Sequence, residues 1–266
     1  MVASDQAALT GTARHGNAGC EYGEDKGIFG FGNAGGNTGV TNLVSNTGVV
    51  ATDVSAVGTA RTKPGACEYG GDKGIFAYGS VGSAPSHYLS MSNLVTNLGV
   101  VGSDVTGVGT ARYALAACEY GDDKGIMGYG APYGATETDV TNLVSNAGVV
   151  ATDVTGVGTA RSQLAACSYG GDKGIFGFGN IGGVSSLTNL VSNVGVVASD
   201  TTGVGTARRS LAACEYGGAK GIFGFGYLDG TGNVSMTNLV STAGVVATDT
   251  TGVGTARAEF GACSFN

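Results

Sequence analysis

One unit of just under fifty residues recurs along almost the whole chain, and this repetition constrains the fold more than any other feature. The tetrapeptide Gly-Thr-Ala-Arg occurs six times in 266 residues. Successive copies are 47, 51, 49, 47 and 49 residues apart. A period of this length is typical of architectures in which each repeat is one supersecondary unit. We therefore expect a single domain over residues 1–266, with five full repeats and a C-terminal half repeat. The six arginines are Arg14, Arg61, Arg112, Arg161, Arg208 and Arg257.

Each unit contains four short runs with the composition of β-strands. Their consensus sequences are LAACEYG, KGIFGFG, TNLVSN and GVVATD, which we call segments A, B, C and D. All four are rich in aromatic or β-branched residues and are bounded by Gly, Asn or Asp, as strands commonly are. The chain has 51 glycines without a three-residue period, which favours many tight turns. No segment shows helical periodicity, so the sequence predicts an all-β fold.

Four strands in just under fifty residues match one blade of a β-propeller, since kelch units span about 50 residues. Stacked radially, such blades cover each other's faces and leave only short edges. Segments A and D occur six times, whereas B and C occur five times. We therefore favour five four-stranded blades, with six as the alternative. The surplus half repeat is expected to help close the ring or to contact a partner.

The run Arg-x-x-Ala-Ala-Cys-Glu-Tyr-Gly, followed by Asp-Lys-Gly-Ile-Phe-Gly-Phe-Gly, resembles the kelch family. The kelch Gly-Gly doublet is displaced or missing, and the Trp usual before the next blade is absent. The cadence TNLVSNTGVVATD…GVGTAR…YGGDKGIFGFG is similar to the kelch-like repeats of bacteriophage tail-fibre and related virion proteins, over nearly the whole chain. That resemblance implies recognition of a host surface.

Two segments vary between units while the rest stays nearly uniform. One lies between B and C, and the other follows the Gly-Thr-Ala-Arg arginine. In an up-and-down blade both connections emerge at the same rim, so we expect one variable face on a rigid scaffold. Unconstrained drift of loops is the alternative explanation. The predicted ligand-binding residues of this face are His15, Asn17, Lys63, His87, Tyr88, Tyr113, Tyr133, Gln163, Arg209, Tyr227, Asp229 and Glu259.

Residues repeated in every unit are interpreted as structural, because a catalytic group is needed once and a framework group in each blade. The six cysteines are expected to be reduced and buried. Segment A glutamates are expected to pair across strands with segment B lysines. Asp and Arg eight residues apart, such as Asp153 and Arg161, are expected to brace neighbouring strands or blades. We predict no catalytic residue, no metal site and no cofactor, and YGGDKG is interpreted as a hairpin turn because no helix follows it.

The remaining expectations concern partners and location. Net charge is −7, and eleven of the thirteen basic residues occupy repeat-equivalent positions, so nucleic acid is not an expected partner. No run of 18 apolar residues occurs, which argues against membrane insertion. The N-terminus shows no signal peptide, so we expect a virion or cytoplasmic protein that acts extracellularly if it is virion-borne. The predicted function is non-catalytic recognition of a cell-surface glycan or protein, and other virion or fibre subunits are the further partners considered. The alternative is an assembly propeller without its own ligand.

Overall fold

The computed structural model describes residues 3–6, 11–134 and 137–265. Within these ranges the chain forms five three-stranded antiparallel sheets and no α-helix, which confirms the all-β prediction. The sheets comprise β1 (Ala18–Tyr22), β2 (Lys26–Gly30) and β3 (Thr41–Val44); β4 (Gly65–Tyr69), β5 (Lys73–Ser80) and β6 (Tyr88–Val95); β8 (Ala116–Tyr120), β9 (Lys124–Gly128) and β11 (Thr141–Val144); β12 (Ala165–Tyr169), β13 (Lys173–Asn180) and β14 (Val184–Val191); and β15 (Ala212–Tyr216), β16 (Lys220–Leu228) and β17 (Gly232–Val240).

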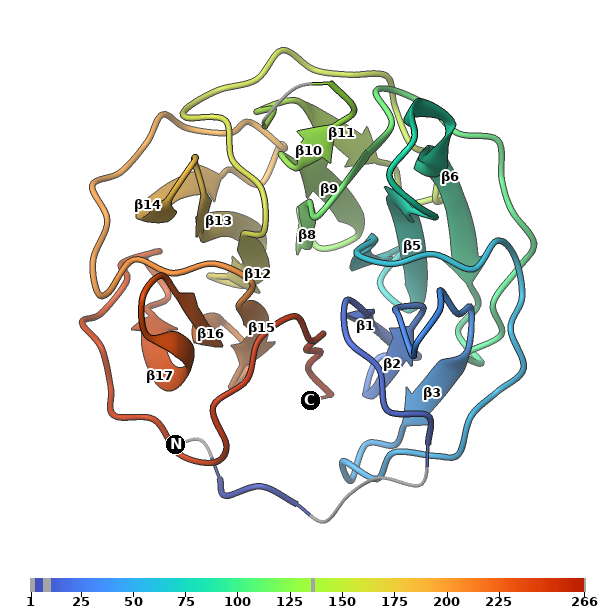
Figure 1. Ribbon diagram of the computed structural model, residues 1–266, viewed down its shortest axis with the longest axis horizontal. Helices are drawn as coiled ribbons and strands as arrows, with labels where there is room; N and C mark the ends of the chain where they lie inside the picture. Colours follow the sequence, from blue (N-terminus) through green and yellow to red (C-terminus); the bar gives the residue numbers. More distant parts are fainter. Residues whose placement is uncertain (1–2, 7–10, 135–136, 266) are drawn as a thin grey trace.

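The five sheets lie around a common centre in the order of the sequence, and we number them 1 to 5 (Figure 1). The segment A strands β1, β4, β8, β12 and β15 are innermost, and each contacts the next. A short pair, β7 (Arg112–Tyr113) with β10 (Ala131–Pro132), and one 3-10 turn, Pro85–His87, lie in the connections. The C-terminal segment runs into the centre, between the last and first sheets (Figure 1).

Segment D differs from the prediction of a fourth regular strand. It pairs with segment C only through isolated bridges, such as those joining Val144 to Val150 and Thr141 to Val154. Between these bridges the Asn142 side chain bonds to the Ala151 carbonyl, at 2.9 Å. The outer segment is therefore held to its sheet partly by a side chain, and a regular ladder does not form along it.

An arginine organises each sheet and is fully buried in sheets 2 to 5, and sheet 3 shows the arrangement in full. Arg112 donates from Nε to the Tyr129 carbonyl at 2.7 Å and from Nη2 to the Asn142 side-chain oxygen at 2.7 Å. Asn142 in turn donates to Asp153 at 2.9 Å, and Asp153 accepts from the backbone N–H and the hydroxyl of Thr110. We call this set the arginine brace. It joins the start of a unit to the outer segment of the same sheet.

The predicted pairing of Asp with the Arg eight residues later is therefore wrong. The Asp153 carboxylate bonds to the threonine of the Gly-Thr-Ala-Arg that ends at Arg112, 41 residues earlier in the chain. In sheet 4 the Asp200 carboxylate likewise lies 3.7 Å from Arg161. The outer segment folds back over the start of its own sheet, so its aspartate meets the Gly-Thr-Ala-Arg that begins that sheet. The eight-residue spacing to the next arginine gave no sign of this contact.

The arginine also joins neighbouring sheets. The Arg161 guanidinium lies 4.3 Å from the centroid of the Tyr129 ring, which belongs to the preceding sheet, and four of the other arginines repeat this contact. Tyr129 has a φ of +65°, and in sheets 2, 4 and 5 the equivalent residue sits where the strand register shifts. Such a bulge re-aims a side chain, here toward the next sheet. The brace is thus both a bond within a sheet and a cation–π contact between sheets.

The repeated lysines pair differently from the prediction. Lys173 bonds to the adjacent Asp172 at 2.5 Å, and the lysines of sheets 1 to 3 do the same with their preceding Asp. Strand register places Lys173 opposite Tyr169, so it does not face the segment A position that carries Glu in the other sheets. The expected Glu–Lys cross-strand pairs are therefore wrong.

Six residues close a circle of backbone hydrogen bonds around the centre. Each N–H donates to the carbonyl of the equivalent residue one unit earlier, at 2.6 to 3.1 Å, and Gly16 donates to Glu259. All six have a φ between +52° and +62°, which aims the peptide groups around the circle. The C-terminal half repeat therefore occupies a sixth position. The members are Gly16, Lys63, Ala114, Gln163, Ser210 and Glu259.

The N-terminal segment contributes to the same sixth position. Asp5 accepts from the backbone N–H and hydroxyl of Thr255 and lies 2.9 Å from Arg257 Nη1. Asp153 makes the same contacts with Thr110, but it is linked to Arg112 through the Asn142 side chain. The two ends of the chain are thus joined by the repeat's own contact.

We predict that Arg112→Ala lowers the free energy of unfolding by about 3 kcal/mol, because it leaves the buried Asn142 side chain and Tyr129 carbonyl unpartnered. Arg257→Ala should cost less than about 1 kcal/mol, since Arg257 is half-exposed and has only the exposed Asp5 as a charged partner. Urea denaturation of both variants measures the difference. Equal losses would contradict the role of burial.

Candidate functional site

The two variable segments of each unit lie side by side. Isolated antiparallel bridges join His15 to Asn33, Thr62 to Ser80, Ser162 to Asn180 and Arg209 to Tyr227. In sheet 3 the same place is taken by the β7–β10 pair. The connection that enters a sheet and the loop between its second and third strands therefore emerge together, and we call the surface they form the loop face.

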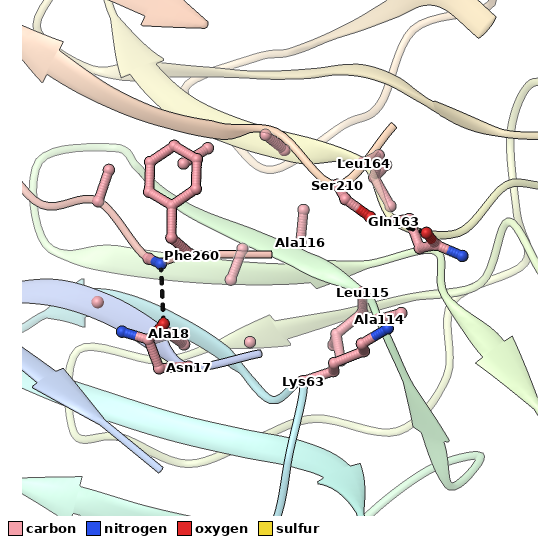
Figure 2. A pocket seen from close by; sticks show the side chains of 18 of the residues that line it. Asn17, Ala18, Lys63, Ala114, Leu115, Ala116, Gln163, Leu164, Ser210 and Phe260 are labelled. Carbon is pink, nitrogen blue, oxygen red and sulfur yellow. Dashed lines mark hydrogen bonds between the residues drawn. The ribbon is translucent and has the colours of Figure 1, made fainter. Parts of the chain in front are cut away.

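A depression lies at the centre of the loop face (Figure 2). It has a volume of about 130 Å³, and all six units contribute to its lining. Four predicted residues line it: Asn17, Lys63, Gln163 and Glu259. Their polar groups are paired with neighbours. Lys63 bonds to Glu259 at 2.7 Å, Ser210 bonds to Gln163 at 2.8 Å, and the Gly261 N–H donates to Asn17 at 3.2 Å.

Beside the depression, three predicted tyrosines form a cluster. The ring centroids of Tyr88 and Tyr113 are 5.2 Å apart, and those of Tyr88 and Tyr133 are 5.7 Å apart. Tyr133 is 53% exposed. Tyr88 and Tyr113 also line a hollow of about 590 Å³, which we call the tyrosine hollow. Its other polar lining residues include Asn33, Asn37, Thr62, Lys63, Ser80 and Ser83.

A second group of predicted residues lies on another part of the loop face. His15, Gln163, Arg209, Tyr227 and Glu259 line a hollow of about 440 Å³. The Arg209 guanidinium lies 5.1 Å from the centroid of the Tyr227 ring, and His15 Nδ1 lies 3.1 Å from a Glu259 carboxylate oxygen. Asp229, the remaining predicted residue here, lies 3.0 Å from Arg209. Most of the charged groups of this hollow are thus already paired.

His87 is not brought to either hollow. It ends the 3-10 turn, and its Nδ1 accepts a hydrogen bond from the Ala84 N–H at 3.3 Å. A β-carbon on Gly82 would collide with the His87 ring. The imidazole therefore stabilises its own loop, and its binding role stays an untested prediction.

The segment A glutamates converge at the opposite end of the axis, where they line a common cavity, an arrangement that the sequence suggested less strongly than pairing with the lysines. Together with Ser168, Ser264 and the cysteines they line a cavity of about 60 Å³. Burial, reinforced by the neighbouring carboxylates, raises the pKa of Glu68 to about 7 and that of Glu119 to about 9. Burial also raises the pKa of Glu21, although Ser264 donates a hydrogen bond to it. Their occurrence at the equivalent position in four of the six A segments was the available signal, because innermost strands must meet at the axis.

All six cysteines are free thiols. Each segment A sulfur of sheets 1 to 4 lies against a segment B glycine of the next sheet. For example, a β-carbon on Gly174 would lie 2.5 Å from Cys118 Sγ. The glycine spacing, and not a disulfide, sets the distance between sheets here. Burial raises the pKa of Cys118 to about 12.

No three His, Cys, Asp or Glu side chains are placed to hold a metal ion in the part of the chain that the structure describes. Within the same ranges, no helix has the length and apolar character to span a membrane.

No known family model matches the chain, and no curated protein is significantly similar to it.

We predict that Glu119→Gln raises the melting temperature at pH 8 and leaves it unchanged at pH 4. The pKa of Glu119 is higher in the folded than in the unfolded chain, so unfolding releases a proton between about pH 4.5 and 9. The free energy of unfolding therefore falls as pH rises through that window. Thermal melts at both pH values test this, with the exposed Glu24→Gln as control. A shift of equal size at both pH values would contradict it.

Proposed function

We propose that the chain is a β-propeller with six positions that works as a non-catalytic recognition module, and that its loop face binds a cell-surface glycan. The ring of five sheets, the sixth position formed by the chain ends and the closed circle of backbone bonds support the propeller architecture. A rigid scaffold that carries variable loops at one end is the usual layout of a recognition surface. The number of blades is thereby proposed as five complete and one partial.

The observation that carries the binding proposal is the tyrosine hollow. Tyr88 and Tyr113 offer aromatic faces, on which the apolar face of a sugar ring can stack. Around them lie Asn33, Asn37 and Thr62, whose side chains make long hydrogen bonds, at 3.3 to 3.4 Å, to one another and to backbone carbonyls. Their remaining donor and acceptor positions can bond to sugar hydroxyl groups. This lining carries one cation, Lys63, which already bonds to Glu259, so a neutral sugar fits better than a highly charged one. The sequence cadence similar to tail-fibre repeats supports a location on a virion.

The second candidate is an assembly subunit without its own ligand. What favours it is the sixth position, where the described chain supplies an inner and an outer segment but no strands between them. A glycan array on the isolated chain separates the two functions, because an assembly subunit gives no saturable glycan signal.

We predict that Tyr113→Ala weakens binding to a glycan found on the array by at least about tenfold, which is about 1.4 kcal/mol. Tyr113→Phe should retain most of the affinity, because it keeps the stacking ring. Tyr227→Ala, in the other hollow, is the matched control. Isothermal titration calorimetry gives the affinities, and thermal melts should agree within a few degrees, since loop side chains contribute little to the core. Normal binding by Tyr113→Ala together with a loss in Tyr227→Ala would move the site to the second hollow.

A further inference from the structure

The contacts between neighbouring sheets repeat closely, and they define what the sixth position lacks. At the interface of sheets 3 and 4, Phe176 of β13 lies over Gly128, where a β-carbon would be 2.7 Å from the Phe176 ring. At the same interface Gly174 receives Cys118, and Tyr129 lies beneath Arg161. The interface thus consists of three contacts: a glycine faces a sulfur, an aromatic ring faces a glycine, and a second aromatic ring lies under an arginine.

Sheet 5 has lost these contacts on its outward face. Of the residues that the structure describes, a β-carbon on Gly224 would meet only a Thr237 methyl carbon, at 3.5 Å, whereas its equivalents Gly128 and Gly177 each meet a phenylalanine ring. Cys214 is partly exposed, although four of its equivalents are buried. Leu239, at the end of the same face, is 39% exposed. These residues flank an almost wholly apolar cavity of about 140 Å³, lined among others by Cys214, Ile222, Gly224, Phe225 and Phe260.

Sheet 1 forms the other wall and shows the matching losses. Phe29 is partly exposed, whereas its equivalents Phe76, Phe176 and Phe223 are fully buried. Among the described residues, no aromatic ring lies beneath Arg14, although the other five brace arginines each cover one. The sheet 1 wall therefore lacks a glycine over Phe29 and a ring under Arg14.

The backbone around the open position is also unpaired. Residues 261–265 correspond to segment A but form no strand, because no segment B of the described residues lies beside them. Arg257 bonds to Asp5 and to the Thr255 carbonyl, and no asparagine joins them as Asn142 joins its brace. An inner edge and an outer segment thus face each other with two strands missing between them.

We propose that residues 1–266 accept at this open position a β-hairpin donated in trans by a partner polypeptide, in β-strand addition. Its first strand carries the pattern Gly-Ile-Phe-Gly-Phe, so that its glycines receive Cys214 and Phe29, its first ring covers Gly224 and its second ring lies under Arg14. Its second strand carries an asparagine that completes the brace of Arg257 and Asp5. Backbone pairing with residues 261–265 supplies affinity, and the side chains supply specificity.

A second copy of this chain is a poorer occupant. Every described hairpin of this pattern is already paired within its own sheet, so donating one would open an equal interface in the donor. Within the chain only Phe260 stands in for the missing strands. It packs on Phe225 with ring centroids 5.4 Å apart, at the place where other units carry Leu115, Leu164 or Leu211. This proposal concerns a different surface from the glycan site and does not depend on it.

The test uses a dye-labelled synthetic peptide with the sequence of residues 170–193 as the hairpin. We expect saturable 1:1 binding by fluorescence anisotropy. Amide hydrogen exchange in residues 261–265 should slow when the peptide is bound, because these amides gain strand partners. Phe260→Leu should tighten binding, since it restores the residue of the other units.

Two control substitutions make the test specific. Gly224→Val should leave the melting temperature nearly unchanged, because its side chain meets open space, and should weaken peptide binding at least about tenfold. Gly36→Ala, also in open space but on a loop, should change neither. A peptide with valine in place of its first segment B glycine, the counterpart of Gly174, should not bind.

A free hairpin is marginally stable, so a fused variant guards against a false negative. The sequence of residues 171–193 is appended directly after Asn266. We expect a higher melting temperature and slowed exchange in residues 261–265, with both effects lost in Gly224→Val. Absence of both effects in the fusion, together with absence of peptide binding, overturns the proposal. So does a stable dimer by light scattering that Gly224→Val dissociates and the peptide does not, because the occupant is then a second copy.

Discussion

The fold depends on an arginine that is buried at every complete sheet interface. Arg61, Arg112, Arg161 and Arg208 have no exposed surface, so their charge has to be satisfied inside the protein. Backbone carbonyls and an aromatic face do this at all four, and an asparagine side-chain oxygen adds to them at Arg112, Arg161 and Arg208. Nε of Arg61 and Nε of Arg161 have no hydrogen-bond partner among the described residues, and an aspartate lies at the outer end of each network. These groups come from two sheets and four segments. The need to satisfy one buried guanidinium therefore explains why each unit repeats the Gly-Thr-Ala-Arg, the bulged aromatic residue, the Asn and the Asp.

Glycine has the complementary role of letting sheets approach. Gly174 and Gly177 stand where a side chain would collide with Cys118 and with Phe223. The alternation of glycine with Ile and Phe along β13 therefore gives each sheet hollows on the face that its neighbour fills with rings or sulfur. The framework is specified almost entirely by contacts between units, which leaves the loops free to differ in length and chemistry.

Much of this was predictable from the sequence, because repetition reports which residues are structural. The all-β class, the repeat boundaries and segments A to C were predicted, and segment D was placed correctly but is not a regular strand. The partner of Asp153 was not predictable, since proximity in sequence favoured Arg161 over the brace of Arg112. The tyrosine cluster required loops of different units to be placed in space. The excess of A and D segments over B and C segments indicated that the ring of sheets closes irregularly. It did not indicate which contacts are missing at the sixth position.

The loop face and the open position share one short segment, and this has a mechanical consequence. Glu259 belongs to the circle of backbone bonds and pairs with Lys63 in the central depression. The next residue, Phe260, lines both that depression and the apolar cavity of the open position. A displacement of the Phe260 ring therefore acts on a peptide group that is bonded to both neighbouring units. The sixth unit is held by fewer contacts than the others. A change at the loop face therefore has its shortest physical route to the open position through this unit.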